Sequence, residues 1–175
     1  MKQSSPIRIK EVDASFEREP LFPYRFKGSA ITEPWQTAAW LKGESGFSTI
    51  GLGTQGILWS DSKVFATHSE SAGNALMYAM SERALEIMKG NSFISPLQLL
   101  DDLLPEIYAY GKKITVNPDL RKTFALNSLV CVDNAAWLLY AHENNINSFS
   151  DLIPDAYKPG LSWRHERVAS MPSFG

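Results

Sequence analysis

The residues that could do chemistry in this chain are few and scattered. His68, Ser69 and Glu70 are adjacent and have the residue types of a hydrolytic triad. A triad needs side chains that converge in space, however, and neighbours at the start of a helix point in different directions. Capping of a helix explains Ser69 and Glu70 more simply. We therefore interpret these residues as structural.

The sequence does not indicate a metal site or a reactive thiol either. The histidines His68, His142 and His165 and the pair Asp101-Asp102 do not have the spacing of a metal site. Cys131 stands in an apolar stretch with no basic neighbour to lower its pKa, which is typical of an inert core thiol. We predict no catalytic residue and no metal ligand in this chain, and a small hydrolase using His68 or Cys131 has little support.

Two further patterns have a structural interpretation. Asp133 lies beside the apolar stripe of a predicted helix, where we expect it to be partly buried and hydrogen-bonded, and the aromatic Trp137 and Tyr140 are expected to be core anchors. Gly51-x-Gly53-x-x-Gly56 matches a dinucleotide fingerprint as a string. No helix is expected to begin there and no acidic residue follows in a βαβ unit, so we reject a cofactor loop.

Composition indicates one globular domain with a short appendage. Apolar residues make up 44% and charged residues 21% of the 175 residues, and the net charge is −2. This balance provides no broad field to attract nucleic acid or an anionic membrane. The single cysteine and the lack of an export-type leader predict a cytoplasmic location, and the longest apolar stretch is far below the roughly 18 residues of a membrane span.

Alternating apolar residues predict three strands that form an antiparallel meander. In the first strand the alternation slips near Lys10 and Glu11, which predicts a β-bulge. Two prolines favour a loop at Glu19–Gly28. Gly51 and Gly53 in the third strand allow another element to pack against the backbone. The strands are expected at residues 7–16, 32–42 and 47–53.

Helical spacing follows the strands. Thr67 and Glu70 can form a capping box, and Ser95-Pro96 and Asn117-Pro118 are start signals for two more helices. Pro105 should kink or split the second helix, and the third should be the longest. The helices are expected at 67–90, 97–110 and 117–140, with a helical turn at 148–153, a polar connector at 155–167 and a β-like tail at 168–175.

Four stretches combine into a recognisable order: Arg25–Glu33, Gly46–Gly53, Val132–Leu139, and Phe149–Pro154 with Val168–Gly175. Together they resemble the amino-terminal half of the mandelate racemase and muconate lactonising branch of the enolase superfamily. Two departures are visible. Thr54 stands where the family commonly has the glutamate of Gly-x-Gly-Glu, and the third stretch lacks the final acid of the family's Asp-x-Ala-Leu-Trp-Asp helix.

The resemblance implies an α+β fold, in which a three-stranded antiparallel β-meander precedes a helical bundle, as in an enolase N-terminal capping domain. Residues 1–154 would form this domain, and residues 155–175 a connector and the first strand of a TIM barrel. The parent family uses magnesium to abstract the proton α to a carboxylate, with ligands and a base on later barrel strands. A barrel needs about 250 residues, so the chain is expected to hold no cofactor and to be inactive alone.

The resemblance also implies that two loops of the cap, Leu21–Lys27 and Gly56–Asp61, touch the substrate. The basic residues there could meet a carboxylate, with the arginine forming two parallel hydrogen bonds, and the aromatic ones could exclude water. Surface solvation and local packing are the alternative for each residue. The candidate substrate-binding residues are Phe22, Tyr24, Arg25, Lys27 and Trp59.

The resemblance also implies partners, but it does not fix the type of reaction. The expected partner is a small carboxylate bound through the missing barrel, with no nucleic acid, no membrane and a homo-oligomeric assembly typical of the family. The isolated domain should expose an apolar surface where the barrel docks. Racemase, dehydratase and cycloisomerase stay open. The alternative function is a stand-alone α+β binding or protein-interaction module whose tail adds a strand to a partner's sheet.

Overall fold

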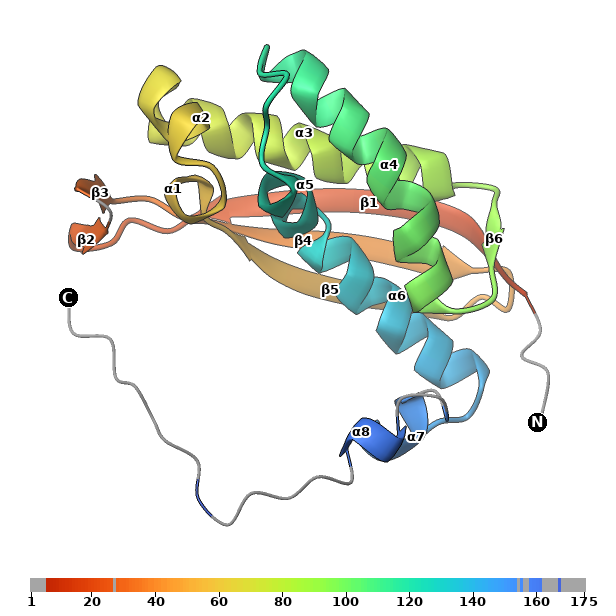
Figure 1. Ribbon diagram of the computed structural model, residues 1–175. Helices are drawn as coiled ribbons and strands as arrows, with labels where there is room; N and C mark the ends of the chain where they lie inside the picture. Colours follow the sequence, from red (N-terminus) through yellow and green to blue (C-terminus); the bar gives the residue numbers. More distant parts are fainter. Residues whose placement is uncertain (1–5, 27, 154, 156–157, 162–166, 168–175) are drawn as a thin grey trace.

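Four strands form an antiparallel sheet in the order β5-β4-β1-β6 (Figure 1). The computed structural model describes residues 6–26, 28–153, 155, 158–161 and 167. The α+β class is as predicted, and the three long strands are neighbours in chain order. The predicted three-stranded sheet is incomplete, because a short fourth strand pairs with β1. The bounds are β1 Ile7–Arg18, β4 Trp35–Gly43, β5 Ser48–Gln55 and β6 Ser92–Phe93.

The β-bulge of the first strand is confirmed. The register of β1 against β4 shifts between Ile9 and Glu11, so one extra residue lies in β1. Ile7 and Ile9 are buried before the bulge, and Val12 and Ala14 pack against the same core after it. The bulge therefore keeps one apolar face along a strand whose sequence changes phase.

The predicted loop at 19–28 is partly wrong, because its second half forms a hairpin. Strand β2 (Tyr24–Phe26) pairs with β3 (Ser29–Ile31) in a separate two-stranded sheet. Gly28 has a φ of 77° in the turn, which a residue without a Cβ adopts at low cost. Lys27 lies outside the described residues.

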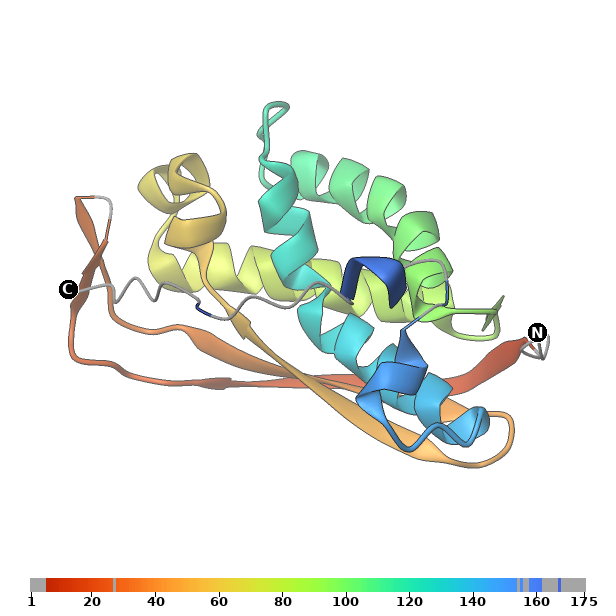
Figure 2. The same cartoon turned by 60° about the horizontal axis from the view of Figure 1, so that its bottom comes forward.

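Eight helices follow in the described part of the chain, and those that pack on the sheet cover one of its faces (Figure 2). The buried side chains of α3, α4, α5 and α6 join those of β1 and β4 in one core. The bounds are α1 Ile57–Ser60, α2 Ser62–Thr67, α3 Glu70–Met88, α4 Pro96–Ile114, α5 Lys122–Ser128, α6 Val130–Glu143, α7 Phe149–Leu152 and α8 Lys158–Leu161.

The expected capping box of Thr67 and Glu70 is wrong. The cap of α3 is Ser69, whose hydroxyl accepts a hydrogen bond from Ala72 N at 3.1 Å. The Thr67 hydroxyl instead donates to Lys63 O inside α2, at 2.9 Å. The expectation that no helix begins after Gly56 is also wrong, since α1 starts at Ile57, but this single turn follows an antiparallel strand and does not make a dinucleotide loop.

The third helix predicted from the sequence is broken into α5 and α6, which are bent by 49°. Ser128 lies at the break, and its hydroxyl donates to Ala125 O at 2.7 Å. The Ser81 hydroxyl donates to Ser128 O at 2.6 Å, so an outside donor takes a carbonyl that a continuous helix would use. The apolar stripe is still buried, and the longest helices are α3 and α4 with 19 residues each.

Helix α4 is one continuous helix, so the predicted split at Pro105 does not occur. It also runs past Gly111, where we expected it to stop. A Cβ on Gly111 would lie 2.5 Å from Met80 Cε, so this glycine allows α4 to pack closely on α3. The glycine therefore serves packing and does not mark a helix end.

The prediction that Gly51 and Gly53 admit a close neighbour is confirmed. The neighbour is α6: a Cβ on Gly51 would lie 2.1 Å from Cys131 O, and one on Gly53 would lie 2.9 Å from Cys131 N. The Thr49 hydroxyl also donates to Ala135 O at 3.0 Å. Helix α6 therefore rests directly on the backbone of β5.

The carboxyl-terminal part is described only in pieces. The helical turn predicted at 148–153 is present as α7, and α8 lies within the stretch expected to be a polar connector. The β-like tail at 168–175 lies outside the described residues. Within those residues no single helix is long and apolar enough to cross a membrane, although the bent pair α5 and α6 meets that criterion by length and composition.

Candidate functional site

Both segments predicted to touch substrate lie at one end of the sheet, next to the start of α3 (Figure 1). We call this region, residues 19–34 and 56–62, the loop end. Phe22 is 94% exposed, Trp59 is 60% exposed and Tyr24 is 42% exposed, and Arg25 is also exposed. Four of the five candidate residues are thus at the loop end and open to solvent, while Lys27 is not described. Their role in binding stays a prediction.

Helix α1 presents Trp59 from an otherwise buried turn. Its neighbours Leu58 and Ser60 are buried, and the Ser60 hydroxyl donates to Asn127 Oδ1 at 3.0 Å. The same oxygen accepts from Gly56 N at 3.0 Å, and the Thr123 hydroxyl donates to Ser60 O at 2.7 Å. Contacts from α5 therefore hold the turn at both ends, and the indole of Trp59 projects from a fixed base.

Asp61, the residue after α1, also connects this region to the chain just before α5. The side chain is only 1% exposed, and Oδ1 accepts from Lys63 N at 2.9 Å and from Val64 N at 3.3 Å, which caps α2. Oδ2 accepts from Arg121 N at 2.8 Å. The carboxylate is thus used by three backbone amides, as expected for a structural cap.

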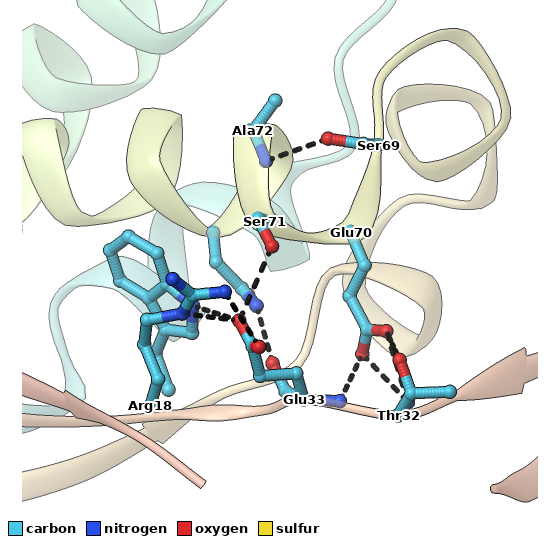
Figure 3. A network of polar contacts seen from close by, with 9 residues as sticks. Arg18, Thr32, Glu33, Ser69, Glu70, Ser71 and Ala72 are labelled. Atoms are coloured by element: carbon cyan, nitrogen blue, oxygen red, sulfur yellow. Dashed lines mark hydrogen bonds and ion pairs between the residues drawn. The ribbon is translucent and has the colours of Figure 1, made fainter. Parts of the chain in front are cut away.

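The β2–β3 hairpin is anchored by Glu70, the first residue of α3 (Figure 3). Its carboxylate accepts from the Thr32 hydroxyl at 2.7 Å, from Thr32 N at 2.9 Å and from Glu33 N at 3.2 Å. Thr32 and Glu33 connect the hairpin to β4. The carboxylate of Glu70 lies at a helix start, where the helix dipole favours negative charge, and it therefore holds the base of the hairpin by hydrogen bonds.

Glu33 joins β1 to the same cluster. Arg18 donates to its two carboxylate oxygens, from Nε and from Nη2, each at 2.7 Å. The guanidinium lowers the pKa of the Glu33 carboxyl, with weaker support from the Trp35 indole N–H and the Ser71 hydroxyl. Glu33 is therefore an ionised, fully engaged carboxylate at the loop end.

The two anchored segments are connected through the first turns of α3. Asn74 donates from Nδ2 to Glu33 O at 3.0 Å. The preceding residue, Gly73, packs against α1, because a Cβ there would lie 2.5 Å from Ile57 Cδ1. The hairpin and the α1 turn are thus held by one rigid element, which places their exposed aromatic side chains relative to each other.

The remaining candidates for chemistry are occupied or inert. His68 Nδ1 lies 3.1 Å from Val64 O, and the Ser69 hydroxyl caps α3, so the triad is not formed. Burial raises the pKa of the Cys131 thiol, and burial also raises the pKa of the half-buried Asp133 carboxyl against a hydrogen bond from Trp137. Among the described residues no three His, Cys, Asp or Glu side chains gather in a way that could hold a metal ion.

Sequence reasoning did not find the residues that position the loop end. Arg18, Glu33, Glu70, Asp61 and Asn127 make contacts to residues that are mostly distant in the chain. The one local signal is Asp61, an acid two residues before the amide that it caps. The other contacts have no signature in a single sequence.

Comparisons with known proteins concern the fold. No family model matches the sequence, and no curated protein matches it by sequence. Among solved structures, the chain is similar to a dipeptide epimerase from Enterococcus faecalis V583 complexed with Mg and the dipeptide L-Leu-L-Tyr, with a TM-score of 0.46 and 16% identity. It is also similar to a mandelate racemase/muconate lactonizing enzyme, with a TM-score of 0.42 and 14% identity.

These matches cover 78% and 75% of this chain but only 32% and 30% of the respective solved chains. The chain therefore spans less than a third of the length of either protein.

Proposed function

We propose that this chain is the capping domain of an enolase-superfamily enzyme that abstracts the proton α to a carboxylate, with the loop end facing the substrate. The observation that carries the proposal is the position of the two predicted loops. They are distant in sequence, yet they lie at one end of the sheet, and each presents an exposed aromatic side chain, Phe22 and Trp59, beside a rigid anchor. The catalytic barrel lies outside residues 1–175 in this proposal.

Each loop-end residue has a role in the proposal. Phe22 and Trp59 exclude water when the cap closes over the substrate, because large apolar surfaces lower the local dielectric. Arg25 is exposed and binds a carboxylate through its planar guanidinium. Tyr24 excludes water together with Phe22 and Trp59, and Lys27 supplies a second cation. The exposed positions of the described residues support these roles.

The loop end does not fit a magnesium site. Its buried or half-buried acids are already engaged: Asp61 by three backbone amides, Glu33 by Arg18, and Glu70 by Thr32. Magnesium requires near-octahedral oxygen ligands, usually one or two free carboxylates with water. We therefore place the metal ligands and the base in the proposed barrel.

The first experiment asks whether a barrel belongs to this chain. We expect the reading frame after codon 175 to continue with alternating strand and helix segments that carry acids at strand ends. We also expect residues 1–175 alone to show no exchange of the α-proton of mandelate or of a dipeptide with D₂O in the presence of Mg²⁺. A stop codon at this point favours the stand-alone module, and turnover by the isolated chain removes the capping role.

The second experiment uses the complete reading frame and tests the loop end. Trp59→Ala should lower kcat/KM by about tenfold, which corresponds to about 1.4 kcal/mol of lost transition-state stabilisation. The matched control is Phe149→Ala, because Phe149 is 79% exposed but lies on α7, away from the loop end. The control should stay within about twofold of the wild type. Equal effects of the two substitutions would contradict the proposal.

A further inference from the structure

The face of the sheet opposite the helices has an apolar centre. Trp40 of β4 pairs with Ile50 of β5, and Ala38 pairs with Leu52 in the next row on the same face. Ile50 is 58% exposed and Leu52 is 67% exposed, whereas the alternate residues of both strands are mostly buried under the helices. Two neighbouring aliphatic side chains this exposed, beside a tryptophan, are typical of an interaction surface. We call this side of the sheet, opposite the helices, the open face (Figure 2).

Charges are arranged on both sides of this centre along β1. The adjacent rows are Asp13–Trp40–Ile50 and Ser15–Ala38–Leu52, so the centre lies beside Ala14. Before it stand the exposed cations Arg8 and Lys10, and after it the exposed acids Glu17 and Glu19. Lys10 and Glu17 lie at similar distances from Ala14, roughly 10 Å along the strand, in opposite directions.

These flanking charges are mostly free to bind something else. Within the described residues, none of the four side chains takes part in an ion pair, and only the Glu19 side chain accepts a hydrogen bond, from Gln36 Nε2 at 2.7 Å. The other charged pair on this face, Lys42 and Glu11, is neutralised internally at 3.0 Å. The open face therefore has a basic end, an apolar centre and an acidic end.

We infer that the open face binds a second copy of this chain. The two copies are related by a two-fold axis that lies between their sheets, perpendicular to the strands and level with Ala14. This axis places the basic end of each copy on the acidic end of the other. The same operation places the row of Trp40 and Ile50 on the row of Ala38 and Leu52 of the second copy, so that Ile50 packs against Leu52. A surface of this kind is self-complementary, as an isologous dimer requires, and the sheets pack face to face as in a β-sandwich. Asp13 then faces Ser15 of the second copy.

The size of the open face sets the strength of the dimer. Three strands of about eight residues cover roughly 27 Å by 14 Å, or about 400 Å² per copy. Stable complexes bury about 800 Å² per partner. The dimer is therefore weak and reversible, with a dissociation constant in the micromolar range or above. This inference is independent of the proposed function, because the apolar centre lies on β4 and β5 and none of the five candidate substrate-binding residues belongs to the open face.

Charge reversal provides a decisive test. Arg8→Glu with Lys10→Glu makes both ends acidic, and Glu17→Lys with Glu19→Lys makes both ends basic. Each double variant alone should dissociate at least tenfold more readily than the wild type, since like charges then face each other. An equimolar mixture of the two should form a heterodimer at least as tight as the wild-type dimer, because both contacts are then between opposite charges.

Sedimentation velocity over about 1 μM to 1 mM protein measures the association, and native mass spectrometry identifies the heterodimer. Leu52→Ser should weaken the wild-type dimer at least tenfold, while Val116→Ser, at an exposed site away from this face, should leave it unchanged. Circular dichroism checks that each variant is folded. A wild-type chain that stays monomeric at the highest concentration overturns the inference, as does a mixture that fails to associate.

Discussion

Gly51→Ala tests the contact on which the packing of α6 depends. The added methyl group would lie 2.1 Å from Cys131 O and 2.2 Å from Ala135 N, both backbone atoms of α6. Ordinary contact begins at 3.4 Å. A side chain could turn away from the methyl group, but helix backbone cannot, so α6 must move from the sheet by more than about 1 Å. A gap of that size removes a quarter to a half of the dispersion energy of the atoms that face it.

The expected loss follows from the buried surface of α6. Overpacking of a well-packed core costs about 1–3 kcal/mol, and we expect the upper end because a whole helix is displaced. For a chain of this length, about 3 kcal/mol lowers the midpoint of thermal unfolding by about 6–12 °C. The buried side chains of α6 are Cys131, Val132, Ala135, Ala136 and Leu139.

Urea unfolding followed by circular dichroism measures this loss against two matched substitutions. Gly53→Ala should cost less, because its Cβ would meet Cys131 N at 2.9 Å and the side chain of Val130 at 3.3 Å. Gly56→Ala should change the free energy of unfolding by less than about 0.5 kcal/mol, since nothing lies within 4 Å of that Cβ. A loss below about 1 kcal/mol for Gly51→Ala, or a different order of the three variants, would refute the reasoning.

Three further outcomes are expected. Glu70→Ala should cost about 1–2 kcal/mol and speed amide hydrogen exchange in the β2–β3 hairpin, whereas Glu86→Ala, at an exposed ion pair, should do neither. Burial raises the pKa of the Asp133 carboxyl, so its ionised form destabilises the folded protein at neutral pH. Asp133→Asn should therefore raise the thermal midpoint at pH 7, by an amount that shrinks as the pH falls through that raised pKa and the wild type takes up its proton. Cys131, 1% exposed and with its thiol pKa raised by burial, should react with a disulfide reagent only after unfolding.

Features that depend on neighbours in the chain could be predicted from the sequence. The phase slip in β1 predicted the bulge, because the period of a strand is local and a single extra residue reverses it. Gly51 and Gly53 predicted a close neighbour, because only a missing Cβ allows backbone to approach backbone. Periodicity also located α3 and α4 and the buried stripe of α5 and α6.

Features that depend on distant partners were decided by the tertiary structure. The break before α6 depends on Ser81 of α3, whose hydroxyl donates a hydrogen bond to the carbonyl oxygen of Ser128. The anchoring of the hairpin by Glu70 and the position of the β2–β3 hairpin and α1 at one end of the sheet likewise need the assembled fold. The residue types at these positions are ordinary in many contexts, and only the packing of the chain brings a donor to one particular acceptor. The sequence by itself determined the three long strands, the helices α3 and α4 and their apolar faces, because these depend on local periodicity. The tertiary structure decided where helices end and which segments lie side by side, because distant partners set both.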